Sequence, residues 1–149
     1  MGRTAQASQR SPSRSPTDET WALLRGLIGQ QRRRFLTVAS EHDLHPAQAG
    51  ALLQMNPDEP RPMHELAALL ACDNSNVTGI IDRLEARGLV ARQPYQQDRR
   101  VKHVVLTPLG ARLREQMSAL MARPPAGFER LSPGEQRQLR DLLRRAVED

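Results

Sequence analysis

The stretch from Pro62 to Leu106 constrains the fold of this chain more than any other part of the sequence. It predicts a short helix that begins at Pro62 and ends near Cys72, followed by a second helix that stops at Gly88. Three residues between these helices are good N-caps: Asp73, Asn74 and Ser75. The second helix has apolar residues at the spacing of a helix buried on one side: Val77, Ile80, Ile81 and Leu84. Two short helices joined by so short a turn predict a helix-turn-helix.

Two β-rich segments follow the second helix, Leu89–Gln93 and Val101–Leu106. The residues between them are polar and turn-forming, and a short charged run stands near the tip: Asp98, Arg99 and Arg100. We therefore expect a β-hairpin with a basic tip directly after the helix-turn-helix, which is the layout of a winged helix. The predicted fold class is mainly α with a small β-hairpin wing.

Amphipathic helices are expected on both sides of this unit. The first runs from about Asp18, which can cap it, to Ser40, and its length of roughly 35 Å suits a helix shared between two subunits. A short helix spans Pro46–Met55. Thr107 and Ser132, each followed by proline, predict the starts of two more helices. The last helix is expected to bury four residues: Leu139, Leu142, Leu143 and Val147.

Composition narrows the classes of partner. The formal net charge is +5, which favours double-stranded DNA over an anionic membrane, and the aromatic content of 3% argues against stacking platforms for single strands. A single cysteine, Cys72, excludes an intrachain disulfide framework and, with no secretory signal or membrane-length apolar run, indicates a cytoplasmic protein. No nucleophile–base pair, phosphate loop or carboxylate pair has useful spacing, so we expect neither an enzyme nor a bound cofactor.

An ordered set of short motifs resembles the MarR (multiple antibiotic resistance regulator) family. These are His64-Glu65-Leu66-Ala67, Asn76-Val77-Thr78, Asp82-Arg83-Leu84-Glu85, Gly88-Leu89-Val90, Asp98-Arg99-Arg100, Leu106-Thr107-Pro108-Leu109-Gly110 and Leu131-Ser132-Pro133. The resemblance covers about 18–147, and the spacing between the motifs matches as well.

The resemblance implies a homodimer in which two winged lobes face successive major grooves of a pseudo-palindromic operator. Members usually repress, and many release DNA when a small aromatic or phenolic acid, or an oxidant, acts on them. Residues 1–17, rich in Ser, Arg, Gln and Pro, are expected from their composition to be a disordered basic arm, and the resemblance makes 18–149 one domain. Within it, 18–45 and 107–149 would form the dimerisation helices and 46–106 the DNA-binding lobe.

The expected DNA contacts come from two places. The second helix of the motif would enter the major groove with Asn74, Ser75, Asn76, Thr78, Gly79 and Arg83. The wing would contribute Asp98, Arg99 and Arg100. The resemblance assigns the minor-groove contact to Arg100, while Asp98 would orient Arg83 or Arg100. Gly79 stands where the family often has a larger polar residue, so base reading by the helix is expected to be sparse.

An effector pocket is expected between the dimerisation helices and the lobe, lined by Trp21, His42, His45, Met55 and Arg92. Cys72 is interpreted as a buried small hydrophobe, with a redox switch as a minority alternative. His42 and His45, with Glu41 beside them, lack the further ligands that a zinc site needs, so no metal is predicted. The alternative functions are a winged-helix module that binds protein without an operator, and a metal- or redox-responsive regulator.

Overall fold

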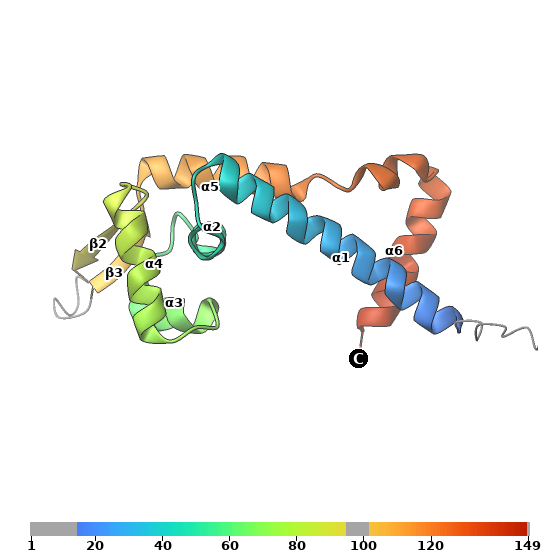
Figure 1. Cartoon of the computed structure of the whole chain (residues 1–149), viewed down its shortest axis with the longest axis horizontal. Coiled ribbons are helices and arrows are strands. Elements are labelled where there is room, and N and C mark those ends of the chain that lie inside the picture. The colour runs from blue at the N-terminus through green and yellow to red at the C-terminus, as the bar shows by residue number, and fades with distance from the viewer. Residues whose placement is uncertain (1–14, 95–101, 149) are drawn as a thin grey trace, which may run out of the picture.

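The structure is a computed structural model that describes residues 15–94 and 102–148. In chain order its elements are α1 (Pro16–Glu41), α2 (Pro46–Gln54), β1 (Arg61–Pro62), α3 (Met63–Leu69), α4 (Asn74–Ala86), β2 (Val90–Pro94), β3 (Lys102–Leu106), α5 (Pro108–Ala122), the 3-10 helix η1 (Ala126–Arg130) and α6 (Pro133–Val147). A winged lobe that contains α2, α3, α4 and the strands lies at one end of the molecule, and α6 lies at the other (Figure 1). The long helices α1 and α5 run between the two ends. The predicted fold class is confirmed.

The strands form a three-stranded antiparallel sheet in the order β1-β3-β2. In the predicted hairpin, Val90 pairs with Leu106 and Pro94 pairs with Lys102. Strand β1 was not predicted: it is only two residues long, and Arg61 pairs with Val104, more than forty positions away in the sequence. This strand ties the start of the helix-turn-helix to the wing.

Local capping explains where the long helices begin. Thr107 caps α5 and Ser132 caps α6, as predicted. The prediction that Asp18 caps α1 was wrong. Ser15 is the cap: its hydroxyl accepts a hydrogen bond from the Asp18 N–H at 3.2 Å, and the Asp18 carboxylate accepts one from the Ser15 N–H at 3.3 Å. Asp18 is therefore the third residue of the helix and the second half of a capping box.

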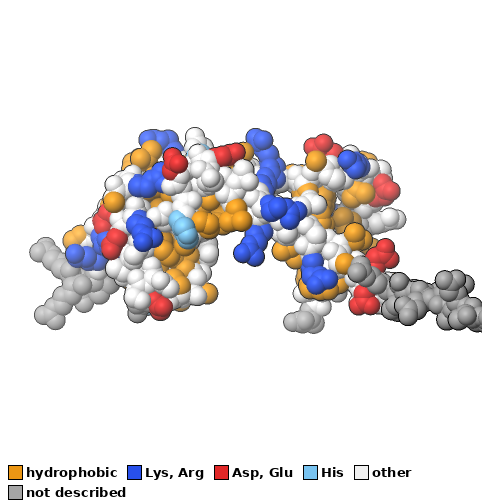
Figure 2. All heavy atoms as spheres, viewed as in Figure 1, with side chains coloured by type: hydrophobic (Ala, Val, Ile, Leu, Met, Phe, Trp, Pro, Cys, Tyr) orange, Lys and Arg blue, Asp and Glu red, His pale blue; other side chains and the backbone are white. Residues whose placement is uncertain are grey.

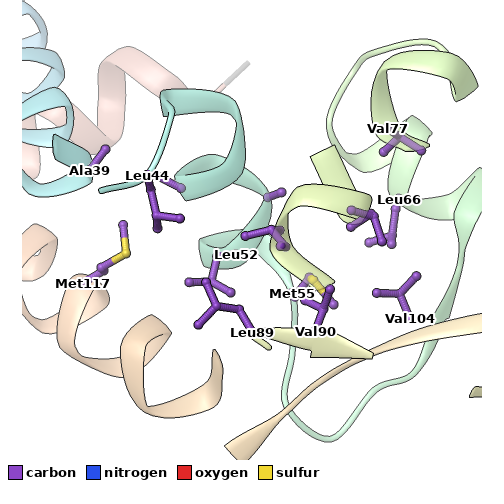
Figure 3. Close-up of a cluster of buried hydrophobic side chains, with 14 of the residues drawn as sticks. Ala39, Leu44, Leu52, Met55, Leu66, Val77, Leu89, Val90, Val104 and Met117 are labelled. Atoms are coloured by element: carbon purple, nitrogen blue, oxygen red, sulfur yellow. The ribbon is translucent and has the colours of Figure 1, made fainter. Parts of the chain in front are cut away.

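The hydrophobic core lies in the winged lobe, at the C-terminal end of α1 and along α5 as far as Met121 (Figure 3). Ala39 of α1 and Met117 of α5 point toward Leu44, and the core continues from there beneath the sheet. The largest fully buried side chains are Leu52, Met55, Leu66, Ile81, Leu84, Met117, Val77, Val90 and Val104. Because α4 contributes three of these, the recognition helix of the motif is fixed firmly to the lobe.

The opposite end has little core of its own. Helix α6 contains no buried residue, and α1 buries only Val38 and Ala39, close to its C-terminus. The predicted burial of Leu142 and Val147 is not met within one chain, since their exposed fractions are 59% and 78%. Hydrophobic side chains reach the surface at this end of the molecule (Figure 2). The physical reason is that no element within residues 15–94 and 102–148 covers this face of α6.

Candidate nucleic-acid interface

Asp73 fixes the N-terminus of α4. Its Oδ1 accepts hydrogen bonds from the Asn76 N–H at 2.8 Å and from the Ser75 hydroxyl at 2.6 Å. The hydrogen bond from Ser75, followed by that from the Asn76 backbone, lowers the pKa of Asp73 below its ordinary value. Of the three caps that the sequence offered, the structure uses Asp73, so α4 begins at Asn74. The positive end of the helix dipole also stabilises an ionised cap at this position.

Helix α4 buries one face and exposes the other. Val77, Ile81 and Leu84 are fully buried, as expected from their spacing, and Ile80 is half-buried. The predicted DNA-contact residues on the outer face are Ser75, Asn76, Thr78 and Arg83, all exposed, with Gly79 partly exposed among them. The side chain of Asn74 is outside the described part of the structure. Hydroxyl, amide and guanidinium groups on one helix face can hydrogen-bond base edges or phosphates.

A groove of about 470 Å³ separates the outer face of α4 from α2. It is lined by His45, Ala47, Gly50 and Gln54 on one side, by Leu70 and Cys72 at the turn, and by Ser75, Asn76, Gly79, Ile80 and Arg83 on α4. A Cβ added to Gly79 would meet no atom within 4 Å. The absence of a side chain at Gly79 therefore helps to open the groove and is not required by packing within the chain. Cys72 is half-buried and packs against the core.

The wing strands are held against α4 by Arg92. This residue of β2 donates hydrogen bonds to Asp82 at 2.5 Å and to Glu85, both on α4. Burial acts to lower the pKa of Arg92, but the hydrogen bonds and charges of the two carboxylates outweigh it and raise the pKa overall. The tip residues Asp98, Arg99 and Arg100 lie outside the described residues. What the structure gives is the base of the wing and its attachment to α4.

The five residues predicted for an effector pocket occupy different environments. Met55 is buried in the core, and Arg92 is engaged by the carboxylates of α4. His42 follows the last turn of α1, whereas His45 caps α2, with its Nδ1 accepting from the Ala47 N–H at 3.4 Å. Trp21 is exposed on the N-terminal half of α1. A single chain therefore does not gather these side chains around one cavity among its described residues.

The C-terminal end of α4 makes contacts that sequence reasoning missed. Arg87 donates hydrogen bonds to the carbonyl oxygens of His42 at 3.0 Å and Asp43 at 2.5 Å. The Thr107 hydroxyl donates to the carbonyl oxygen of Gly88 at 2.6 Å. These partners stand 45, 44 and 19 positions apart in the sequence, so no local pattern pointed to them.

Within residues 15–94 and 102–148, no three His, Cys, Asp or Glu side chains are grouped so that they could hold a metal ion. None of the helices in the same ranges has both the length and the apolar character that a bilayer crossing requires.

Comparison with known proteins identifies the family. The model of the MarR family matches residues 45–102, the segment that holds the helix-turn-helix and most of the wing. The repressor NicR of Pseudomonas putida is 31% identical over 119 residues, which cover 74% of this chain and 75% of NicR. The chain belongs to the MarR family. It is therefore a transcriptional regulator with a DNA-binding fold, in a family of regulators and not of enzymes.

Solved structures agree with this assignment. The crystal structure of MarR from E. coli without ligand superposes with a TM-score of 0.68 at 26% identity, covering 86% of this chain and 96% of MarR. BpsR of Bordetella bronchiseptica superposes with a TM-score of 0.58 at 28% identity, covering 87% of this chain and 99% of BpsR. The BpsR structure addresses how 6-hydroxynicotinic acid regulates its binding to DNA.

Proposed function

We propose that this chain is a homodimeric repressor that binds a pseudo-palindromic operator and releases it when a small aromatic acid binds. The observation that carries the proposal is the outer face of α4, where exposed Ser75, Asn76, Thr78 and Arg83 stand beside the wing in a chain of the MarR family. A helix of this kind enters the major groove with its N-terminal half. Gly79 and Asn74 belong to the same proposed contact surface.

Homodimerisation is supported by the uncovered apolar face at the end that carries α6. Leu139, Leu143 and Phe128 line an apolar groove of about 640 Å³, and Trp21 and Ile28 of α1 are also exposed. A monomer would leave this surface in water, at a cost of roughly 25 cal/mol for each Å² of apolar area. A second copy of the chain is the occupant that the family relationship favours.

The repressor and effector parts of the proposal draw on relatives. NicR is a repressor, and BpsR responds to 6-hydroxynicotinic acid. In the dimer, Trp21, His42, His45, Met55 and Arg92 are the proposed surroundings of the effector. A thermal-shift titration with 6-hydroxynicotinic acid tests this, because a ligand that binds only the folded state raises the melting temperature. An unchanged melting temperature across a panel of aromatic acids would refute effector control by this class of ligand.

The wing is proposed to read the minor groove with Arg100, with Arg99 and Asp98 beside it. Arg100→Ala is expected to weaken operator binding by roughly 1–3 kcal/mol without dissociating the dimer, because it removes a cation from an electronegative groove. Fluorescence anisotropy at physiological salt measures the change. An affinity equal to that of the wild type would show that Arg100 does not contribute to the interface.

Selection from random double-stranded DNA with the full-length protein tests the proposed function as a whole. The expected result is an enriched pair of inverted half-sites whose centres lie about one helical turn apart. Enrichment of no sequence, with binding that disappears as salt is raised, would show only a non-specific basic protein.

A further inference from the structure

The recognition helix α4 is anchored at its C-terminal end to both of the long helices. On one side, the Arg87 guanidinium donates two hydrogen bonds to the carbonyl oxygens of His42 and Asp43, where α1 ends. On the other side, the Thr107 hydroxyl, at the start of α5, donates to the carbonyl oxygens of Gly88 at 2.6 Å and Leu89 at 3.2 Å. The turn after α4 is thus the point where three helices meet.

Arg87 supplies a positive charge at the C-terminal end of α1. The last turn of α1 contains no basic residue, although the C-terminal end of a helix carries partial negative charge. The chain turns there through Asp43, whose φ of 53° lies in the left-handed region, and the N–H groups of Asp43 and Leu44 close the helix on the carbonyl oxygens of Ser40 at 3.0 Å and Ala39 at 2.9 Å. The carbonyl groups of His42 and Asp43 come directly after the helix. Arg87 brings a planar, two-pronged cation to these carbonyls from the end of α4.

The start of α5 also lies close against the turn after α4. The Thr107 hydroxyl also accepts a hydrogen bond from the Gly110 N–H at 3.0 Å. A Cβ at Gly110 would lie 1.9 Å from the Leu89 carbonyl oxygen, so α5 approaches the turn with no space for a side chain. Leu89 is buried, and this contact is therefore a fixed point of the lobe.

We propose that Arg87 is a positioning residue that sets the angle of α4 against the long helices and thereby the half-site spacing that the dimer accepts. This inference rests on the proposed function. Helix α4 has 13 residues, so its DNA-facing end lies about 20 Å from the anchor. A rotation of about 10° at the anchor moves that end by roughly 3.5 Å, which is about one base pair along DNA.

The experiment uses the full-length dimer and the operator obtained by selection. Base pairs are inserted or removed between the half-sites, and anisotropy gives the Kd for each spacing and for a single half-site. In Arg87→Gln the ratio between the Kd at a spacing changed by one base pair and the Kd at the best spacing is expected to fall at least about fivefold. Binding to the single half-site is expected to stay within about twofold of wild type, because Arg87 is directed toward α1.

Two further variants control this measurement. Arg87→Lys retains the charge without the two-pronged geometry, so it should give an intermediate spacing ratio. If Arg87→Gln does not fold, the spacing ratio of Arg87→Lys is compared with that of the wild type instead. Arg145→Gln also removes one positive charge, but from an exposed residue of α6 that does not line the apolar groove, and it should behave as wild type.

Several results would overturn the inference. A wild-type spacing ratio in a folded Arg87→Gln dimer would do so, as would an equal loss of affinity for every DNA, which would mark a phosphate contact. A wild-type protein that accepts all spacings equally would also overturn it. If the wild type selects no paired half-sites, the proposed function fails and the inference falls with it, whereas a failure confined to the Arg87 variants leaves the proposed function intact.

Discussion

Gly110 and Gly79 are both glycines within helices, but only Gly110 is required by its surroundings. A Cβ at Gly110 would overlap the Leu89 carbonyl oxygen, while a Cβ at Gly79 would lie in open space. Gly110→Ala is therefore expected to lower the free energy of unfolding by about 3 kcal/mol, as in an overpacked core. Gly79→Ala is expected to raise it by roughly 0.5–1 kcal/mol, because alanine is the better helix former.

Urea unfolding of the dimer without DNA, at a fixed protein concentration, measures both changes. Gly79→Ala serves as the matched control, since it makes the same substitution within a helix at a position where the added Cβ meets no atom within 4 Å. Equal effects of the two substitutions would contradict the close contact between α5 and the turn after α4.

The cap of α4 predicts a pH-dependent effect at a single residue. Because the folded-state pKa of Asp73 lies below its unfolded value, its stabilising contribution is fully present above the unfolded pKa and is lost as the pH falls through the folded pKa. Ser75→Ala removes the hydrogen bond with the largest effect on this carboxyl, so the pKa of Asp73 should move up toward its ordinary value. Carboxyl ¹³C NMR titration measures it. Ser132→Ala, at the cap of α6, should leave the Asp73 titration unchanged, and a response to it would show that the shift is not local.

At the scale of elements, the sequence predicts what is encoded locally. The caps Thr107 and Ser132 act within three residues of themselves, and the buried face of α4 follows from helical spacing, so both could be predicted. Strand β1 could not, because two residues carry no periodicity and Val104, the partner of Arg61, stands more than forty positions away in the sequence. The Ser15 cap of α1 was missed because Asp18 fits the same role, and only the observed hydrogen bonds distinguish the two.

The attachment of the wing to α4 predicts an electrostatic effect between elements. Arg92→Gln is expected to weaken operator binding about tenfold, or roughly 1.4 kcal/mol, because Asp82 and Glu85 lose their cation and then repel the DNA phosphates. Anisotropy at low and high salt measures the effect, which should shrink as salt screens the repulsion. The double variant Arg92→Gln/Asp82→Asn should recover part of the affinity. A loss that does not change with salt would point instead to altered wing geometry.

At the scale of the whole molecule, the residues of the proposed interface fall into two groups. Some could be predicted from the spacing within one helix, and others depend on contacts between different elements. The outer face of α4 could be predicted because Ser75, Asn76 and Arg83 alternate with buried positions on one helix. The role of Arg92 was missed because its partners come from a different element, and the contact between Arg87 and the end of α1 bridges more than forty residues. The uncovered face of α6 has no partner within the described chain, so its burial depends on a second molecule.

Because burial of this face depends on a second molecule, a change within it should affect dimerisation. Leu139 lies in the apolar groove of α6 with Phe128 and Leu143. Leu139→Asp is expected to raise the dimer dissociation constant at least about a hundredfold, or roughly 2.7 kcal/mol, because a carboxylate would be buried without a partner. Sedimentation equilibrium measures the constant, and affinity for the paired operator should fall together with the dimer fraction. Arg137→Asp is the matched control, since residues two apart on a helix project about 200° from each other and the same carboxylate would face solvent. A Leu139→Asp protein that remains a dimer and binds the operator as wild type does would exclude this face of α6 from the interface.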